Sequence, residues 1–207
     1  MPTAATQRPP AARRTQAERR ASSRAKLLDA AVLALAQRGY AGASLPEVVR
    51  RAGLSNGGLW RYFQSKAELM AAAELHAEES LLAAVVHEPD PAPTPQARVD
   101  AAVDRMLEWA RQPALQAIIE LILASRSDPE VRAALEATDD RAAAIFFRAM
   151  RDLLGDELAT HPHFEANVRQ LGLVLYGVTL TDHLRPEWAS EALAIELRAV
   201  TRRLFDL

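Results

Sequence analysis

Apolar residues recur along this chain at the spacing of α-helices, and Gly, Pro and polar residues separate one repeat from the next. A first helix is predicted between Ser22 or Ser23, which are suitable N-caps, and Gly39, where the pattern stops. Its apolar face is formed by Leu27, Leu28, Ala31, Val32, Leu35 and Ala36. Residues 1–20 lack this periodicity and mix Pro, Ala, Thr and Arg, so we expect a disordered basic arm over residues 1–21.

A second, short helix is predicted in the segment SLPEVVRRAG. Ser44 and Glu47 have the spacing of a capping box, and Pro46 falls in the first turn, where its missing N–H costs little. Gly53 ends the segment and is expected to supply an unusual backbone angle for a tight turn.

A third short helix begins near Ser55 or Asn56 and is expected to continue through Phe63. Ser65 and Glu68 then have capping-box spacing and start a fourth, longer helix, which runs to the Pro-rich break HEPDPAPTPQ. Short helices joined by a tight turn are typical of a helix-turn-helix, whose later helix enters the DNA major groove. The positions expected to face outward are small or polar: Ser55, Asn56, Gly57, Gly58 and Arg61.

Five further helices are predicted beyond the Pro-rich break. They span Ala97–Arg111, Pro113–Ser125, Pro129–Leu154, Phe164–His183 and Pro186–Phe205. The chain is rich in Ala, Leu, Arg and Glu and poor in Gly, and this composition also favours helix over strand. The sequence therefore predicts an all-α protein of about nine helices.

Charge is distributed unevenly along the chain, although the net charge is only −2. Residues 1–70 carry twelve Lys and Arg against four Asp and Glu, a net charge of +8. Residues 71–207 carry thirteen against twenty-three, a net charge of −10. A basic head on an acidic body indicates that the head binds a polyanion, although chance clustering around a solvated basic tail would give the same count.

Several classes of function find no support in the sequence. There is no cysteine, no phosphate-cradling Gly loop and no nucleophile elbow, so we expect neither an enzyme nor a bound cofactor. His161 and His163 lack a third ligand at a suitable spacing, which argues against a metal site. No apolar run is long enough for a membrane span, and we expect a cytoplasmic protein.

The run from residue 27 to residue 70, LLDAAVLALAQRGYAGASLPEVVRRAGLSNGGLWRYFQSKAELM, resembles the DNA-binding region of TetR-family transcriptional regulators. The resemblance covers residues 24–70 and rests on Gly39-Tyr40, Ala52-Gly53-Leu54-Ser55, Gly57, Leu59, Tyr62-Phe63 and Ser65-Lys66. The chain departs from the family pattern at Ala43, Val49, Gly58 and Trp60. Trp60 replaces the usual Tyr, so an indole N–H stands where a phenolic O–H would contact phosphate.

The resemblance implies specific roles for residues of the head, which spans residues 22–70. Contacts to phosphate fall to Ser44, Trp60, Tyr62 and Lys66. Positions near base edges fall to Asn56, Gly57 and Arg61, and Ser55 and Gly58 complete the candidate DNA-binding set. Arg61 suits guanine and phosphate equally well, while Tyr62 and Trp60 suit phosphate contacts and core packing equally well. Core packing is the expected role of Phe63.

The resemblance also implies that residues 71–207 form a helical bundle that binds a small molecule and dimerises through its last two long helices. QLGLVLYGVTL is apolar on all sides, and the last helix carries an apolar stripe. The candidate interface residues are Leu171, Gly172, Leu175, Leu193, Leu197, Val200 and Leu204. Packing within one protomer is the alternative role for such a stripe.

A candidate effector pocket centres on Glu120, which lies among apolar residues in LQAIIELILAS. A carboxylate that faces inward there must be paired with a cation or a ligand, whereas one that faces water needs neither. The other candidate lining residues are Met106, Trp109, Phe146, Phe147, Met150 and Tyr176, with core packing as the alternative. An acidic body with such a pocket favours a lipophilic or cationic effector.

Taken together, the sequence predicts a homodimeric, ligand-responsive regulator that binds a palindromic double-stranded DNA operator and is released by its effector, as a repressor. The alternative is a DNA-binding regulator that activates transcription or works through a protein partner rather than a small molecule. A helix-turn-helix used for protein interaction would favour outward Leu or Phe in place of Asn56 and Arg61.

Overall fold

The computed structural model describes residues 15–87, 94–182, 184–188 and 190–207. Residues 1–14 of the predicted arm lie outside this range. Within the described residues there are eleven α-helices, one 3-10 helix and no strand, which confirms the predicted all-α fold. No helix in the described part of the chain is both long and apolar enough to span a membrane.

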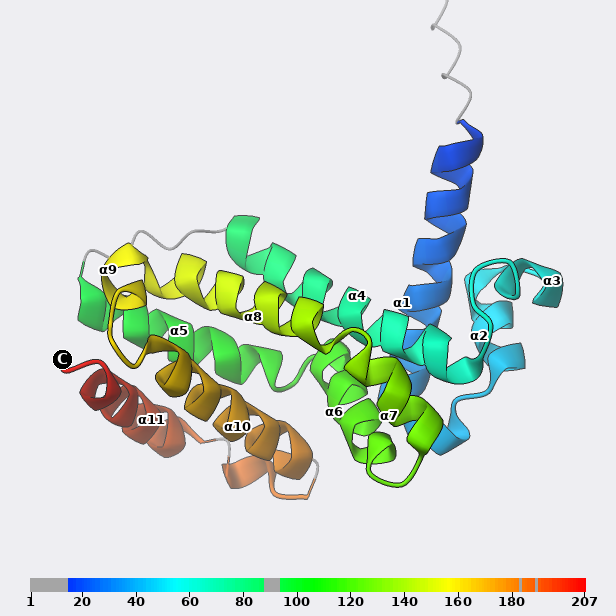
Figure 1. Ribbon diagram of the computed structural model, residues 1–207. Helices are drawn as coiled ribbons and strands as arrows, with labels where there is room; N and C mark the ends of the chain where they lie inside the picture. Colours follow the sequence, from blue (N-terminus) through cyan, green and yellow to red (C-terminus); the bar gives the residue numbers. More distant parts are fainter. Residues whose placement is uncertain (1–14, 88–93, 183, 189) are drawn as a thin grey trace, which may run out of the picture.

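Helix α1 (Gln16–Gly42) begins six residues before the predicted start at Ser22, and that prediction was wrong. The Thr15 hydroxyl accepts a hydrogen bond from the Glu18 N–H, and the Glu18 carboxylate accepts one from the Thr15 N–H. This capping box satisfies two N–H groups of the first turn, so residues 16–21 of the predicted arm are helical. Figure 1 shows these first turns extending away from the body.

The head is completed by α2 (Leu45–Ala52), which packs beside α1, and α3 (Asn56–Leu59), which lies beside α2 (Figure 1). Gly53 adopts the left-handed conformation between them, with φ 67° and ψ 33°, as its place in the sequence predicted. Helix α3 ends at Leu59 rather than at Phe63, so the predicted length was wrong. Two successive glycines have low helix propensity, which explains the early end.

The predicted capping box of α2 is absent, because Ser44 makes no side-chain cap hydrogen bond. Its Glu47 is buried and pairs instead with Arg51, at 2.8 Å, and with Arg38 of α1, at 3.2 Å. Two guanidinium groups compete successfully with a single backbone N–H for this carboxylate. The pairing ties α2 to α1.

Helix α4 (Lys66–His87) leads from the head into the body, where it packs against α1, α6 and α8 (Figure 1). The Ser65 hydroxyl accepts from the Glu68 N–H at 3.1 Å, as a capping box requires. The Glu68 carboxylate accepts from the Gln64 N–H rather than from that of Ser65, so the reciprocal contact is displaced by one residue.

The middle of the body consists of α5 (Pro95–Trp109), α6 (Pro113–Ser125), α7 (Pro129–Glu136), α8 (Asp139–Leu154) and α9 (Asp156–Ala159). The single helix predicted for Pro129–Leu154 was wrong, because α7 and α8 are separate. The Thr138 hydroxyl donates to the Leu135 carbonyl at 3.0 Å, a local bond that competes with the continuing helix.

The last segments are α10 (Phe164–Asp182), a 3-10 helix η1 (Pro186–Trp188) and α11 (Glu191–Leu204). His183, the predicted end of α10, lies outside the described residues. The helix predicted for Pro186–Phe205 is divided, because Ser190 caps the start of α11 through the Leu193 N–H. Helix α11 lies along α5, and α10 packs on α5, α6 and α8.

Candidate functional site

The outer surface of the helix-turn-helix is polar, while its inner surface is part of the core. Val48, Leu59 and Phe63 are at most 3% exposed and pack with the core residues of α1. The outward residues Ser44, Ser55, Asn56, Gly57 and Arg61 are exposed, and Gly58 is partly exposed. These residues are available to a partner because the fold does not use their side chains.

The two glycines of α3 are not required by the backbone. Neither Gly57 nor Gly58 has a positive φ. A Cβ atom added at Gly57 would meet no atom within 4 Å, and one at Gly58 would lie 3.7 Å from the Ser55 Oγ, an ordinary contact. Their lack of side chains therefore leaves room for close approach from outside, as insertion into a groove requires.

The three aromatic residues after α3 have different environments. Phe63 is 3% exposed and lies under the Arg24 guanidinium, which confirms its expected place in the core. Tyr62 is partly buried, and its hydroxyl donates to the Arg20 carbonyl of α1 at 3.3 Å. Trp60 is 54% exposed, so its indole can reach an external partner.

Lys66, a predicted phosphate ligand, is partly buried at the start of α4. Its ammonium donates to the Tyr40 carbonyl at 2.5 Å and lies 4.3 Å from the centre of the Tyr40 ring. Burial lowers the pKa of this amine, and the nearby Asp128 carboxylate partly offsets the effect. Lys66 thus joins α1 to α4 within the protein.

Cations gather along the exposed side of the head. Arg19, Arg20, Arg24 and Lys26 are exposed on α1, and Arg50 is exposed on α2. Exposed cations beside a polar helix-turn-helix raise the local concentration of a polyanion and bind its phosphates without regard to sequence.

The body contains a cavity of about 480 Å³ that is lined by residues of α4, α5, α6, α7, α8 and α10. Four of the seven predicted pocket residues line it: Trp109, Phe146, Phe147 and Tyr176. Met150 is wholly buried in the core, and Met106 lies in a neighbouring crevice with Leu171 and Leu175. The prediction was wrong for these two methionines, because apolar spacing does not distinguish a cavity wall from a core.

Glu120 does not line the cavity, so its placement in the effector pocket was wrong. It is partly buried on α6, where a Cβ added to Gly39 of α1 would lie 2.7 Å from its Oε2 atom. Gly39 has φ 64° and kinks the last turn of α1. Glu120 therefore lies at the contact between head and body.

Two carboxylates that the sequence analysis did not single out do line the cavity. Glu74 and Glu78 lie one turn apart on α4, and Glu74 is only 6% exposed. Burial raises the pKa of Glu74 to about 8, with a further contribution from the negative charge of Glu78, whose own pKa burial raises to about 7. Tyr176, across the cavity, has its pKa raised to about 12 by burial and then by these charges.

Comparison with known proteins agrees with this arrangement. Residues 27–73 match the family model of bacterial regulatory proteins of the tetR family. The DNA-binding head is that of the TetR family. This is a family of DNA-binding transcriptional regulators rather than of enzymes, as the sequence predicted.

Other similar proteins match far more of the chain than its head alone. An uncharacterized HTH-type transcriptional regulator of Mycobacterium tuberculosis, Rv2912c, is 26% identical over 174 residues, which are 84% of this chain and 89% of that protein. The structure of a transcriptional regulator from Rhodococcus superimposes with a TM-score of 0.67 at 21% identity, over 88% of this chain and 95% of the other. The multidrug binding protein EbrR, solved in complex with ethidium, gives a TM-score of 0.60 at 25% identity, over 88% and 97%.

The candidate dimer residues fall into two groups. Leu171 and Leu175 are 5% exposed and belong to the core, and a Cβ at Gly172 would lie 3.5 Å from the Phe146 ring. Leu171 and Leu175 therefore pack within the protomer, which is the alternative that the sequence left open, whereas Gly172 is partly exposed and borders the cavity. Leu193, Leu197 and Leu204 are partly buried, and Val200 is 41% exposed.

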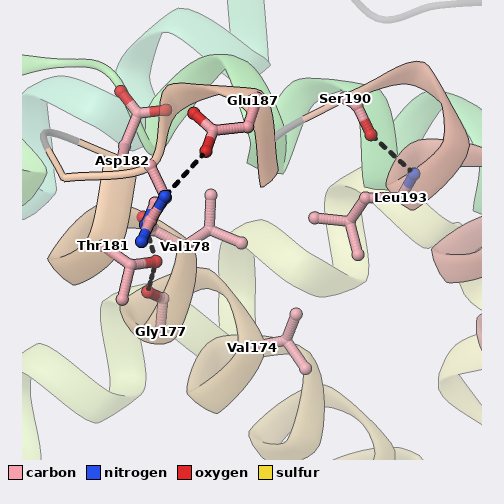
Figure 2. Close-up of a pocket in the computed structure, with 9 residues that line it drawn as sticks. Val174, Gly177, Val178, Thr181, Asp182, Glu187, Ser190 and Leu193 are labelled. Carbon is pink, nitrogen blue, oxygen red and sulfur yellow. Dashed lines mark hydrogen bonds and ion pairs between the residues drawn. The ribbon is translucent and has the colours of Figure 1, made fainter.

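Exposed apolar side chains nevertheless gather on α10, α11 and their connection. This apolar face consists of Val174, Leu180, Leu184, Ile195 and Val200, each between 39% and 69% exposed, whereas Leu173, at 70%, borders the cavity. Between α10 and the segment that leads to α11 lies a groove of about 550 Å³. In Figure 2, Val174, Val178 and Leu193 point into this groove, while Asp182 and Glu187 lie toward one end.

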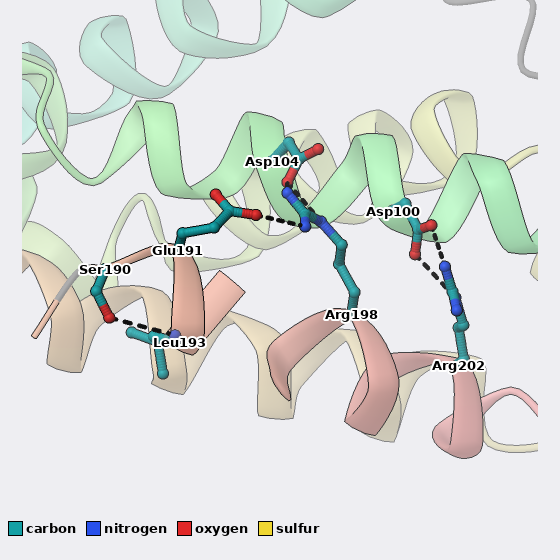
Figure 3. A network of polar contacts seen from close by, with 7 residues as sticks. All are labelled: Asp100, Asp104, Ser190, Glu191, Leu193, Arg198 and Arg202. Atoms are coloured by element: carbon teal, nitrogen blue, oxygen red, sulfur yellow. Dashed lines mark hydrogen bonds and ion pairs between the residues drawn. The ribbon is translucent and has the colours of Figure 1, made fainter. Parts of the chain in front are cut away.

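Ion pairs hold α11 in place against α5 (Figure 3). Arg198 pairs with Asp104 of α5 and, at 3.1 Å, with Glu191 of its own helix. Arg202 pairs with Asp100 through both of its carboxylate oxygens. The charges of these arginines are paired on the α5 side, and of the large apolar side chains of α11 only Ile195 and Val200 are exposed.

His161 and His163 lie in the loop between α9 and α10. The His161 Nε2 atom is 3.2 Å from the Asp206 carboxylate, and its ring packs on Phe205. The His163 N–H donates to the His161 Nδ1 atom at 3.1 Å. Among the residues that the structure describes, no three His, Asp or Glu side chains are grouped as metal ligands would be. His161 therefore fastens the end of the chain to this loop.

Proposed function

We propose that this TetR-family chain is a homodimeric repressor that binds a palindromic operator and leaves it when a small molecule occupies the cavity. Residues 22–70 would bind DNA and residues 71–207 would bind the effector and dimerise, after a basic arm at residues 1–21. One observation carries the proposal: α4 begins at the helix-turn-helix, where Lys66 contacts Tyr40, and lines the cavity two turns later at Glu74.

The proposed docking on DNA places α3 in the major groove. Asn56, Gly57 and Arg61 face base edges, with Ser55 and Gly58 beside them. Ser44, Trp60 and Tyr62 face the phosphates, together with Lys66 at the start of α4. The exposure of Trp60 and Arg61 and the free space beside Gly57 support this placement.

The proposed dimer is formed by the apolar face of α10 and α11. A second copy of the chain is the natural cover for this face, because two half-sites of an operator lie about 34 Å apart and call for two heads related by a two-fold axis. Val200 of the predicted interface is part of this face, and Leu193 and Leu197 adjoin it. Because the proposed partner is a DNA operator, we expect the protein to be located in the cytoplasm.

The proposed effector is a lipophilic or cationic molecule. A volume of about 480 Å³ suits a drug-sized ligand. The cavity walls are mostly apolar and aromatic, and the structurally similar EbrR was solved in complex with ethidium. Effector and operator would each weaken the binding of the other by the same factor, because the coupling between two sites is reciprocal.

Selection from a randomised double-stranded DNA library, at two salt concentrations, tests the proposal. We expect an enriched inverted repeat and a salt slope that reflects several phosphate contacts. Arg61→Ala should then either relax preference at one base pair or weaken binding to every sequence alike. Binding that vanishes with salt and enriches no sequence would contradict a specific operator. If expression of a reporter gene placed behind the operator falls rather than rises when the protein is removed, the protein is an activator.

A further inference from the structure

The wall that α4 contributes to the cavity is acidic, whereas the rest of the lining is largely apolar apart from Thr138, Asp139 and Arg169. Glu74 and Glu78 share a hydrogen bond between their side chains. The Oε2 atom of each carboxyl group is buried and has no hydrogen-bond partner. A polar atom in this state costs free energy, which is recovered when a ligand contacts it.

Charged groups of the neighbouring helices do not neutralise this pair. Asp139 at the start of α8 adds negative charge, and Tyr176 of α10 is neutral. Arg141 of α8 pairs with Glu79. Arg169 of α10 also lines the cavity, where its guanidinium lies 5.0 Å from the centre of the Phe147 ring and makes no ion pair with Glu74 or Glu78. Glu79 faces away from the cavity, and His76, the remaining titratable group on this stretch of α4, pairs with Asp29 of α1. Among the described residues, therefore, no cation pairs with Glu74 or Glu78.

Two buried carboxylates without a cation can be accommodated only if they hold a proton. The shared hydrogen bond is consistent with a protonated Glu74 that donates to Glu78. A positively charged ligand could take the place of that proton, because it would satisfy the free oxygens and cancel the charge at once.

We propose that Glu74 and Glu78 form a cation-binding subsite, and that the effector is an organic cation with a flat apolar body whose charge displaces one proton from this pair into solvent. The inference rests on the proposed function and names the chemical class of its effector. The apolar body contacts Trp109, Phe146 and Phe147, whose rings favour a delocalised cation.

Binding of ethidium, a permanent cation, to the full-length protein without DNA tests the subsite. Its fluorescence, titrated from pH 6 to pH 9, should report an affinity that rises about tenfold per pH unit between pH 7 and pH 8. The rise should be steeper below pH 7, where the free pair holds a second proton, and the affinity should level off above pH 8. Calorimetry at pH 7 in two buffers of different ionisation heat should report about one proton released per ethidium bound.

Replacing Glu by Gln removes the charge of a side chain but keeps its size, so such variants separate the effect of charge on ethidium binding from the effect of shape. Glu74→Gln and Glu78→Gln should each weaken ethidium binding at least tenfold and reduce the proton release. Glu79→Gln, which removes an outward carboxylate from the same helix, should leave both unchanged. Neutral phenanthridine, which has the ring core of ethidium without its charge, should bind the wild type more weakly than ethidium and should bind Glu74→Gln at least as well as the wild type.

Three results would overturn the inference: ethidium affinity that is independent of pH, equal ethidium affinity in the Gln variants, or no ethidium binding at 1 mM when phenanthridine binds. Because the wild-type calorimetry needs no variant, misfolding of a Gln variant does not remove the test. Operator selection fails or succeeds independently. Ethidium binding with proton release but without an enriched operator would leave the subsite standing and remove the regulatory role.

Discussion

The Lys66 ammonium lies over the Tyr40 ring and donates to the Tyr40 carbonyl, so one side chain joins the first residue of α4 to the kinked end of α1. The kink itself is made by Gly39, whose left-handed φ of 64° turns the last residues of α1 toward α2. The contact therefore controls how the helix-turn-helix is held relative to the helix that lines the cavity.

Replacing Lys66 by Ala should reduce stability as well as DNA binding. A charged hydrogen bond and a cation–π contact are lost, together worth about 2 kcal/mol. Differential scanning calorimetry should show a melting temperature lower by roughly 4–8 °C. Binding to all DNA sequences should weaken by a similar factor in competition assays. An unchanged melting temperature would mean that Lys66 does not fix the junction.

Gly57→Ala should separate the needs of the fold from those of DNA. The added methyl group has free space and improves helix propensity, so thermal stability should rise by up to about 1 kcal/mol. The same methyl group projects toward the proposed groove contact, so operator affinity should fall at least tenfold in a gel-shift titration. Unchanged affinity would show that α3 does not approach the bases closely at this residue.

Stability should depend on pH through the two cavity carboxylates. Their pKa values in the folded protein, about 8 for Glu74 and about 7 for Glu78, lie above the ordinary value of 4.5. The folded state therefore holds more protons than the unfolded state within this window, and stability should fall as pH rises from about 5 to about 8 and then level off. Thermal unfolding at constant ionic strength measures this fall, which should be smaller in Glu74→Gln. A curve that rises through the same window would contradict the burial of an uncompensated pair.

A charge on the apolar face of α10 and α11 should prevent dimerisation. Leu180→Lys and Ile195→Lys each place an ammonium where the proposed partner packs, so sedimentation velocity should show monomers at concentrations that keep the wild type dimeric. Leu33→Lys, on an exposed apolar residue of α1, is the matched control and should remain dimeric. Dimers in all three proteins would exclude this face as the interface.

The head was largely predictable from the sequence because its signals are local. A positive φ at Gly53 and the burial of Phe63 follow from residues within a few positions of each other, and the structure confirms both. The start of α1 was missed because Thr15 and Glu18 form their capping box in a stretch whose composition suggested disorder.

The cavity of the body was less predictable because burial there depends on distant segments. In AELHAEESLL, Glu74 and Glu78 have the spacing of an ordinary solvated helix face. They are enclosed because α8 and α10 pack over them, which no local pattern reveals. Glu120 was the more conspicuous carboxylate in the sequence, yet its helix turns it toward Gly39.

The acidic and aromatic walls of the cavity come from different helices, and this separation is useful for the design of biosensors. Helix α4 carries both the contact with the head and the acidic wall, whereas most of the aromatic wall comes from Phe146, Phe147 and Tyr176 on α8 and α10. Under the proposed function, libraries restricted to the cavity residues of α8 and α10 should change which molecules bind, while the contact between α4 and the head stays intact. A reporter strain built on this chain would then respond to new molecules with an unchanged promoter.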